Sequence, residues 1–281
     1  MNGSHDANKD WLSTPTNVQS IVPADISILS LIRAGGQGAV FRGEVGGTSA
    51  AVKIYFPGQL ATRIQREVNA LASLQCVSIV NILKFCSVNF GSESLQLVAT
   101  EFIEGQNLED QIIQQGPLSE NELGNLAYDV VLAINSMWQH RIVHRDLKPA
   151  NIIRRPSGRF CVIDLGVARH TEMSSLTAMG FTWGTYGYFS PEQTKAIRQL
   201  TCKSDLYALG IVLVEAGLGR HPTNRDQLRL LAWRLHESLP APLDSMSLSS
   251  IIQSVLDPKP TKRPKPEALL AQLSRYSSNP T

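Results

Sequence analysis

The sequence predicts an α+β fold with two unlike lobes, the first built on strands and the second mainly on helices. Short apolar runs punctuated by glycine fill the first third of the chain from Ile26 onwards, which is typical of strands joined by turns. From residue 119 the apolar residues recur at helical spacing instead. Because strands and helices are segregated along the chain, the two kinds of element are expected to form separate lobes.

The composition is that of an ordinary globular protein. The chain has 281 residues, of which 43% are hydrophobic and 18% charged, with a formal net charge of +2. This length allows one large domain or two lobes that share an interface. Without a dense basic run, the charge gives no indication of a nucleic-acid partner. The four cysteines form no CxxC pair, so we expect reduced thiols and no cysteine metal site.

Residues 1–24 are predicted to be a flexible tail because they are polar. Trp11 and Leu12 are the most prominent apolar pair in this segment, and the alternative is that they dock on a partner or on the rest of the chain. The segment lacks the apolar core of a signal peptide. The longest apolar run, at 206–214, is too short to span a bilayer. We therefore expect a cytoplasmic protein with no membrane partner.

Strands are predicted in the first lobe over residues 39–45, 49–56 and 95–102, with a turn over 44–49. The stretch RAGGQGAV, which begins at Arg33, leads into the first of them. Its glycines are compatible with a loop that binds phosphates through backbone N–H groups. They are equally compatible with an ordinary hairpin turn, and the stretch alone does not decide between the two.

A helix is predicted between the second and third strands, over residues 60–74. Its apolar side chains recur at helical spacing, at Leu60, Ile64, Val68, Leu71 and Leu74. Glu67 falls near this apolar face, where a buried carboxylate needs a cationic partner. The alternative is that Glu67 lies at the edge of the apolar stripe and is solvated.

In the second lobe, Ser119 and Glu122 have the spacing of a capping box and begin a helix that continues through Trp138. Further helices are expected over three ranges, 205–217, 226–238 and 266–275.

The stretch IVHRDLKPANII carries the most chemistry in the chain. Asp146, Lys148 and Asn151 fall within six residues, and an acid, an amine and a carboxamide so close can orient a hydroxyl, neutralise a phosphate and bind a metal. Asp164 follows thirteen residues later, at the end of the apolar run FCVI and two residues before Gly166. Mg²⁺ prefers hard oxygen ligands of this kind. Any one of these residues alone could be a loop side chain that caps its own turn, but the combination argues against that.

Taken in order, these motifs resemble those of the eukaryotic-type (Hanks-type) serine/threonine protein kinases. RAGGQGAV resembles the glycine-rich loop, AAVK the strand lysine, LVATEFIEG the hinge, HRDLKPAN the catalytic loop and DLG the DFG motif. SPE stands in the place of APE. In SDLYALG and DPKPTKRP the resemblance implies that Asp205 anchors the catalytic loop and that Arg263 pairs with Glu192. The resemblance covers roughly residues 27–277 and rests on nine ordered elements.

The resemblance implies a bilobal kinase fold in a single kinase domain. The N-lobe, over residues 25–103, would hold an antiparallel sheet and one helix, and the C-lobe, over 104–281, would be mainly helical.

The resemblance also implies the catalytic roles. Lys53 would hold the α- and β-phosphates of ATP, and Glu67 would hold Lys53. Asp146 would orient the substrate hydroxyl, while Lys148 would steady the γ-phosphate.

ATP and Mg²⁺ are the implied cofactors, with Mn²⁺ as an alternative metal, and Asn151 and Asp164 are the implied metal ligands. The nucleotide would be bound by Ile32, Gly35, Gly36, Gly38, Val40, Ala51, Lys53, Thr100, Glu101, Ile103 and Ile153. Thr100 takes the gatekeeper position, and the backbones of Glu101 and Ile103 would bind the adenine edge.

A lysine two residues after the catalytic aspartate, here Lys148, resembles the pattern of the serine/threonine branch of the family. The implied partners are therefore protein substrates with serine or threonine. GTYGYFSPEQ, over 184–193, is similar to the substrate-shaping segment of bacterial members, in which Thr185 would touch the catalytic loop. Arg145 would pair with a phosphorylated residue of the loop between Asp164 and Glu192. The candidates for autophosphorylation are Thr171, Ser174, Ser175, Thr177 and Thr182. The alternative is that this loop is rich in hydroxyls because it is solvated.

Three departures from the family pattern stand out, at Arg33 and Gln37 in the glycine-rich loop and at Leu165 in DLG. Because Gly35 and Gly38 are kept, we expect altered nucleotide affinity and not lost catalysis. The competing functions are a pseudokinase that acts as a scaffold and a small-molecule phosphotransferase. The sequence does not identify the substrate or the oligomeric state.

Overall fold

The computed structural model describes residues 10–36, 38–57, 64–65, 68–69, 72, 74–164, 186–195, 200–236 and 238–277. The chain forms two compact units. The first contains the described residues up to Leu74 together with Val80–Phe102. The second contains Gln75–Ile79 and the described residues from Ile103 onwards.

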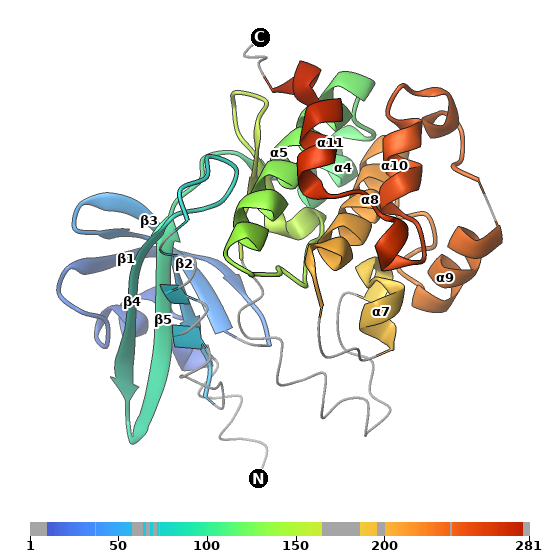
Figure 1. Ribbon diagram of the computed structural model, residues 1–281. Helices are drawn as coiled ribbons and strands as arrows, with labels where there is room; N and C mark the ends of the chain where they lie inside the picture. Colours follow the sequence, from blue (N-terminus) through green and yellow to red (C-terminus); the bar gives the residue numbers. More distant parts are fainter. Residues whose placement is uncertain are drawn as a thin grey trace. The chain divides into compact units, whose positions relative to one another are not determined.

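The first unit is built on a five-stranded antiparallel sheet with the strand order β1-β2-β3-β5-β4 (Figure 1). The strands are β1 (Ile26–Ala34), β2 (Gly38–Val45), β3 (Thr48–Tyr55), β4 (Ile82–Phe90) and β5 (Glu93–Glu101). Two glycines with positive φ close the turn between β2 and β3. The three predicted strands are present, whereas β1 and β4 were not predicted individually. The sequence of β1, ISILSLIRA, does not alternate strictly between apolar and polar residues, and most of the strand is exposed.

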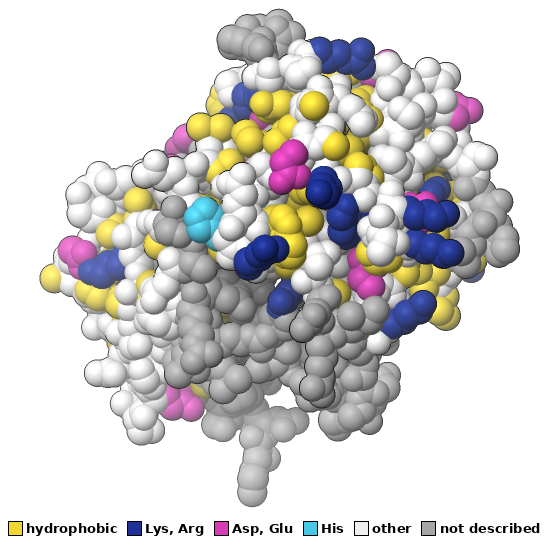
Figure 2. Space-filling view, viewed as in Figure 1, with side chains coloured by type: hydrophobic (Ala, Val, Ile, Leu, Met, Phe, Trp, Pro, Cys, Tyr) yellow, Lys and Arg dark blue, Asp and Glu magenta, His cyan; other side chains and the backbone are white. Residues whose placement is uncertain are grey.

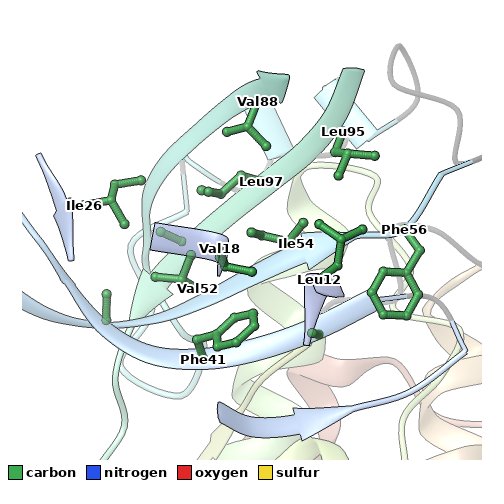
Figure 3. Packing of buried hydrophobic residues seen from close by; sticks show 13 residues of the cluster. Leu12, Val18, Ile26, Phe41, Val52, Ile54, Phe56, Val88, Leu95 and Leu97 are labelled. Carbon is green, nitrogen blue, oxygen red and sulfur yellow. The ribbon is translucent and has the colours of Figure 1, made fainter. Parts of the chain in front are cut away.

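Residues 10–24 are folded onto this sheet, so the prediction of a flexible tail is wrong for them. A short helix, α2 (Pro15–Gln19), follows a helical turn at residues 10–12. Leu12 and Val18 are fully buried among the apolar side chains of the strands (Figure 3). The Trp11 ring lies 4.9 Å from that of Phe90. Residues 1–9 lie outside the described residues.

Polar contacts also hold this N-terminal segment. The side-chain amide of Gln19 donates to the carbonyl of Ile26 at 3.1 Å and accepts from the N–H of Ile28 at 2.6 Å. These bonds satisfy backbone groups of the edge strand β1 that no further strand among the described residues pairs. This arrangement was not predicted because two short helical turns, separated by Ser13 and Thr14, give no sustained apolar period.

Only part of the predicted helix at 60–74 is described. Its described positions at 64–65, 68–69 and 72 are helical, and Ile64 and Val68 are buried there as the apolar spacing predicted. Glu67 lies outside the described residues.

The second unit is mainly helical, which confirms the predicted α+β fold class with an antiparallel strand lobe and a helical lobe. Its helices are α4 (Leu108–Gln115), α5 (Glu120–Gln139), α7 (Pro191–Thr194), α8 (Cys202–Leu218), α9 (Gln227–His236), α10 (Ser249–Val255) and α11 (Pro266–Gln272). A small antiparallel sheet contains β6 (Gln106–Asn107), β7 (Ile152–Arg154) and β8 (Phe160–Val162).

Helix α8 is the centre of the second unit. Nearly every residue of it is buried, and α5 and α10 pack against it (Figure 1). Helix α5 begins with the predicted capping box, in which the N–H of Ser119 donates to Glu122 at 2.9 Å. The long buried helix therefore gives the loops at its N-terminal end a fixed support.

The charges on the surface and the polarity of the helices are those of an ordinary globular protein. On the face shown in Figure 2, Lys and Arg side chains are interspersed with Asp and Glu. Within the described ranges, every helix is too short or too polar to cross a bilayer.

Candidate active site

The stretch HRDLKPAN forms a loop that the N-terminal end of α8 holds in place. Asp205, 1% exposed, accepts hydrogen bonds from the backbone N–H groups of His144 at 2.8 Å and Arg145 at 2.9 Å. Burial raises the pKa of the Asp205 carboxyl to about 6, against the opposing effect of His144. Arg145 has a φ of 68°, in the left-handed region. Asp205 thus stabilises a strained backbone conformation next to Asp146.

Asp146, Lys148 and Asn151 lie together, as their spacing suggested. The Asp146 carboxylate is 3.1 Å from Lys148 Nζ. The Asn151 side-chain amide donates to the Asp146 carbonyl at 2.9 Å and to its carboxylate at 3.2 Å. Asp146 is 6% exposed, so a buried carboxylate is balanced by an ammonium group and an amide N–H.

Asp164 follows strand β8, beside the same loop. The N–H of Ile163 donates to the carbonyl of Asn151 at 2.9 Å, so Asp164 comes directly after the residue that is paired with Asn151. Asp164 is exposed and has a φ of 51°. Among the described residues there is no cluster of three His, Cys, Asp or Glu side chains suited to a metal, so a metal here would depend on an amide oxygen as well.

The segment 186–195 forms hydrogen bonds with the HRDLKPAN loop and an ion pair with Arg263. The side-chain amide of Gln193 donates to the carbonyl of Arg145 at 3.1 Å. Glu192 forms a two-pronged ion pair with Arg263, at 2.6 and 3.0 Å, and both side chains are buried. Burial alone would raise the pKa of Glu192, but the hydrogen bonds and charge of Arg263 outweigh it and lower that pKa.

In the first unit, the sheet register brings four predicted nucleotide-binding residues to one face. Val40 is opposite Lys53, and Ala51 is opposite Thr100. Because directly paired residues and residues two apart share a face, these four side chains point to the same side. The buried cluster around Leu12 lies on the other face, which carries every second residue of these strands.

The glycine-rich stretch is the hairpin between β1 and β2. The N–H of Gly35 donates to the carbonyl of Gly38 at 3.0 Å, and Arg33 is an exposed residue of β1 opposite Val40. A Cβ on Gly38 would lie 2.1 Å from a carbonyl oxygen of β3, whereas Gly35 and Gly36 have open space around them. The stretch therefore forms a hairpin turn, and the open space at Gly35 and Gly36 is compatible with the binding of phosphates there.

The remaining predicted residues are distributed over both units. Ile32 is 50% exposed on β1, and Lys53 Nζ lies 4.9 Å from the centroid of the Tyr55 ring. The N–H of Glu101 donates to the carbonyl of Asn81 at 2.9 Å, so a ligand at this residue would have to use its carbonyl. Ile103 and Ile153 are half-buried in the second unit. Gln37, Glu67, Leu165, Thr185 and the five hydroxyl candidates between 171 and 182 lie outside the described residues.

Comparison with known proteins identifies the family. The family model for the protein kinase domain matches residues 27–273. The chain belongs to the protein kinase family. It is 33% identical to "Probable serine/threonine-protein kinase PknB" of Lactococcus lactis subsp. lactis over 223 residues, 76% of this chain and 35% of that protein. It is 33% identical to "Serine/threonine-protein kinase PrkC" of Bacillus subtilis over 236 residues, 81% of this chain and 35% of that protein.

A third relative is "Serine/threonine-protein kinase pkn3" of Myxococcus xanthus, 31% identical over 268 residues, 87% of this chain and 48% of that protein. The chain thus spans about a third to a half of the length of these curated relatives. The matches confirm the predicted membership of the Hanks-type kinases and the similarity to bacterial serine/threonine kinases.

Sequence reasoning missed one buried acidic residue near these side chains. Asp129 on α5 is 1% exposed, accepts from the N–H of Phe160 at 2.8 Å, and pairs with Arg159. It thereby fixes the strand that leads to Asp164. Burial raises the pKa of Asp129 despite these bonds. A sequence signal for Asp129 existed: it lies three residues after the apolar Leu126, so it falls near the apolar face of its helix. Glu67 has the same spacing from Ile64 in the sequence.

Proposed function

We propose that this kinase domain transfers the γ-phosphoryl group of ATP to serine and threonine hydroxyls of protein substrates. The observation that carries the proposal is the cluster of Asp146, Lys148 and Asn151 on a loop held by Asp205. The names of the bacterial relatives support serine and threonine as acceptors.

In this proposal Asp146 accepts the hydrogen bond of the substrate hydroxyl and orients its oxygen for attack on the γ-phosphorus. The ammonium group of Lys148 lies 3.1 Å from the Asp146 carboxylate. The same ammonium can stabilise charge on the transferred phosphoryl oxygens. Positioning and charge stabilisation of this kind account for most of kinase catalysis.

Asn151 and Asp164 are the residues that would hold Mg²⁺ or Mn²⁺. Since the amide nitrogen of Asn151 donates to Asp146, its amide oxygen is the atom that can bind a metal. Together with the exposed Asp164 carboxylate it offers the hard oxygen donors that Mg²⁺ prefers, with room for the waters that this ion retains. A metal bound there supplies charge neutralisation for the phosphates.

The residues proposed to bind the nucleotide are those that the family resemblance implies. Lys53 would bind the α- and β-phosphates, with Glu67 as its partner, and the N–H groups of the β1–β2 hairpin would cover them. Val40 and Ala51, which share the face of Lys53, are proposed adenine contacts, and Ile153 is another. The remaining proposed contacts are Ile32, Gly35, Gly36, Gly38, Thr100, the carbonyl of Glu101 and the N–H of Ile103.

We further infer that phosphorylation among residues 171–182 activates the enzyme through Arg145. Arg145 Nε is buried and has no hydrogen-bond partner among the described residues. A phosphate beside it would supply the missing acceptor and a compensating charge. Phosphosite mapping after incubation with MgATP tests this step. Full activity in a variant with alanine at Thr171, Ser174, Ser175, Thr177 and Thr182 would contradict it.

Phosphate transfer from radiolabelled ATP to a casein-like protein tests the main proposal. The Asp146→Asn variant should lose activity by about 100-fold or more, because the hydroxyl loses its acceptor. Asp244→Asn, which makes the same change at an exposed position, should keep it. Labelling of small alcohols in place of protein would favour a small-molecule phosphotransferase. ATP binding without any transfer would favour a pseudokinase.

A further inference from the structure

The segment 186–195 is contacted by the loop over residues 220–226, which leads from α8 to α9 (Figure 1). Gln193 connects this segment to the reaction centre, because its amide donates to the carbonyl of Arg145, the residue before Asp146. A protein substrate whose hydroxyl lies at Asp146 has the segment as its neighbour. The contacts of the 220–226 loop with the segment therefore bear on how such a substrate is positioned.

His221 is at the centre of these contacts. It is 7% exposed, and its Nε2 lies 2.9 Å from the carbonyl oxygen of Gly187. On the other side of the ring, Nδ1 accepts from the backbone N–H groups of Thr223 at 3.2 Å and Arg225 at 2.8 Å. A carbonyl oxygen only accepts and a backbone N–H only donates, so these three bonds require the neutral imidazole with its proton on Nε2.

The same ring supports a strained stretch of the 220–226 loop. Asn224 and Arg225 have φ values of 51° and 64°, in the left-handed region that costs energy for residues other than glycine. His221 Nδ1 offsets part of this cost, because it satisfies two backbone N–H groups of the loop. A doubly protonated ring would turn its own N–H towards these two donors. A proton on Nδ1 is therefore incompatible with the observed contacts.

The segment fits closely against the 220–226 loop. A Cβ on Gly187 would lie 2.7 Å from the Cα of Arg225 and 2.8 Å from His221 Nε2, so a side chain there would collide with the loop. The side-chain amide of Gln227, at the start of α9, donates to the carbonyl of Phe189 at 2.9 Å. Two side chains thus hold backbone carbonyls on either side of residue 188.

The acidic groups near His221 are engaged by other partners. Tyr188 packs edge-on against the imidazole, with ring centroids 5.3 Å apart, and donates its hydroxyl to Glu215 of α8. Arg225 pairs with Glu109 of α4 at 2.5 Å and lies 3.8 Å from Glu215. The nearest cation to the imidazole is therefore already balanced, and a second cation on His221 would repel it.

The remaining charges of the 220–226 loop do not offset this repulsion. The Asp226 carboxylate accepts from backbone N–H groups at the start of α9, at 3.0 Å, and Arg220 is exposed. Burial lowers the pKa of His221 from its usual value of 6.5, and the charge of Arg225 lowers it further, against the hydrogen bond to the Gly187 carbonyl. The folded segment therefore favours the neutral ring.

We propose that His221 is a positioning residue for the protein substrate, because its neutral form holds residues 187–189 beside the catalytic loop and its protonation releases them. This inference rests on the proposed function, since it assumes a substrate chain next to this segment. With the segment released, an imidazole of ordinary pKa is about 90% charged at pH 5.5. The equilibrium constant for release should therefore rise up to about tenfold between pH 7.5 and pH 5.5.

The first test compares hydrogen exchange at residues 187–190 in the wild type and in His221→Gln, at pH 7.5 and pH 5.5. Glutamine offers an uncharged N–H donor in place of the imidazole and takes up no proton there. The ratio of the two exchange rates cancels the intrinsic effect of pH on exchange. This ratio should rise by about threefold or more towards pH 5.5, because only the wild type gains the proton.

The second test measures phosphate transfer to a casein-like protein. The KM of the wild type for this protein, relative to that of His221→Gln, should rise about threefold or more from pH 7.5 to pH 5.5, while the same ratio for ATP changes by less than about twofold. His221→Leu lacks the donor and should raise the KM for the protein about tenfold at pH 7.5, whereas His221→Gln should stay within about threefold of the wild type. A merely structural role would lower stability without separating the two KM values.

His140→Gln is the control, since it removes an imidazole from an exposed position at the end of α5. It should follow the wild type in both tests. Exchange or KM ratios that stay constant with pH would overturn the proposal, as would the loss of pH dependence in His140→Gln. Absence of transfer by the wild type at pH 7.5 would refute the proposed function, and the exchange ratio would still decide whether His221 holds the segment.

If His221→Gln does not fold, nitrogen NMR of the wild-type imidazole decides the matter. The ring should carry its proton on Nε2 at pH 7.5 and take up the second one only below pH 6.5. A proton on Nδ1 at pH 7.5 would overturn the proposal.

Discussion

Leu12 offers a direct test of whether the N-terminal segment is part of the core of the first unit. Its side chain is 0% exposed and packs among the strands, so Leu12→Ala removes buried methyl groups and leaves a cavity. Changes of this kind in protein cores cost about 2–5 kcal/mol. Taking about 3 kcal/mol, and about 2–4 °C per kcal/mol for a chain of this size, the melting temperature should fall by about 6–12 °C.

Thermal unfolding followed by circular dichroism measures this shift, and urea unfolding gives the free energy independently. Leu228→Ala is the matched control, because the same truncation at a side chain 80% exposed should change stability by no more than about 0.5 kcal/mol. If the segment that contains Leu12 were a flexible tail, Leu12→Ala and Leu228→Ala would change the stability equally little. A melting temperature for Leu12→Ala within about 1 °C of the wild type would therefore refute the packing described above.

Three further predictions concern the sites. The pKa of Asp205 is raised from 3.8 for an ordinary aspartate carboxyl to about 6 in the folded state. The folded protein therefore holds this proton more tightly than the unfolded chain, which stabilises the folded state below about pH 4. This contribution to the free energy of unfolding is lost as the pH rises from about 4 to 6. Urea unfolding from pH 4 to 7 should show this loss, of about 3 kcal/mol, in the wild type relative to Asp205→Asn; parallel curves would contradict it. Gly38→Ala should destabilise the sheet, because its Cβ would meet a carbonyl oxygen at 2.1 Å, whereas Gly35→Ala should not; similar melting temperatures would count against this contact. Glu192→Gln leaves the buried Arg263 charge uncompensated and should cost about 3–5 kcal/mol in urea unfolding. A loss below about 1 kcal/mol would mean that water solvates this arginine.

The sequence was sufficient for the fold class and for the grouping of the catalytic loop. Asp146, Lys148 and Asn151 are close in sequence, so local geometry alone brings them together. The capping box of α5 was equally legible, because both of its residues lie within one turn.

The features that were missed depend on contacts between distant segments. Strand β1 carries no strict apolar alternation in its sequence, and its pairing with β2 places it at the edge of the sheet. The N-terminal segment has too few consecutive apolar residues to show a period, and its burial depends on strands that come later in the chain. Asp129 becomes informative only when Arg159 and Phe160 are placed beside it. Side-chain pairings across about 30 residues leave no periodic trace in a single sequence.

Three backbone N–H groups of strand β8 and of the residue after it donate hydrogen bonds to three different parts of the second unit. Phe160 donates to the Asp129 carboxylate, Val162 to the carbonyl of Ser78, and Ile163 to the carbonyl of Asn151. Local opening of this strand would break bonds to α5, to the 75–79 segment and to the catalytic loop at once. Its amide protons should therefore exchange with solvent only when the second unit unfolds as a whole, and the position from which Asp164 projects is fixed before any ligand arrives.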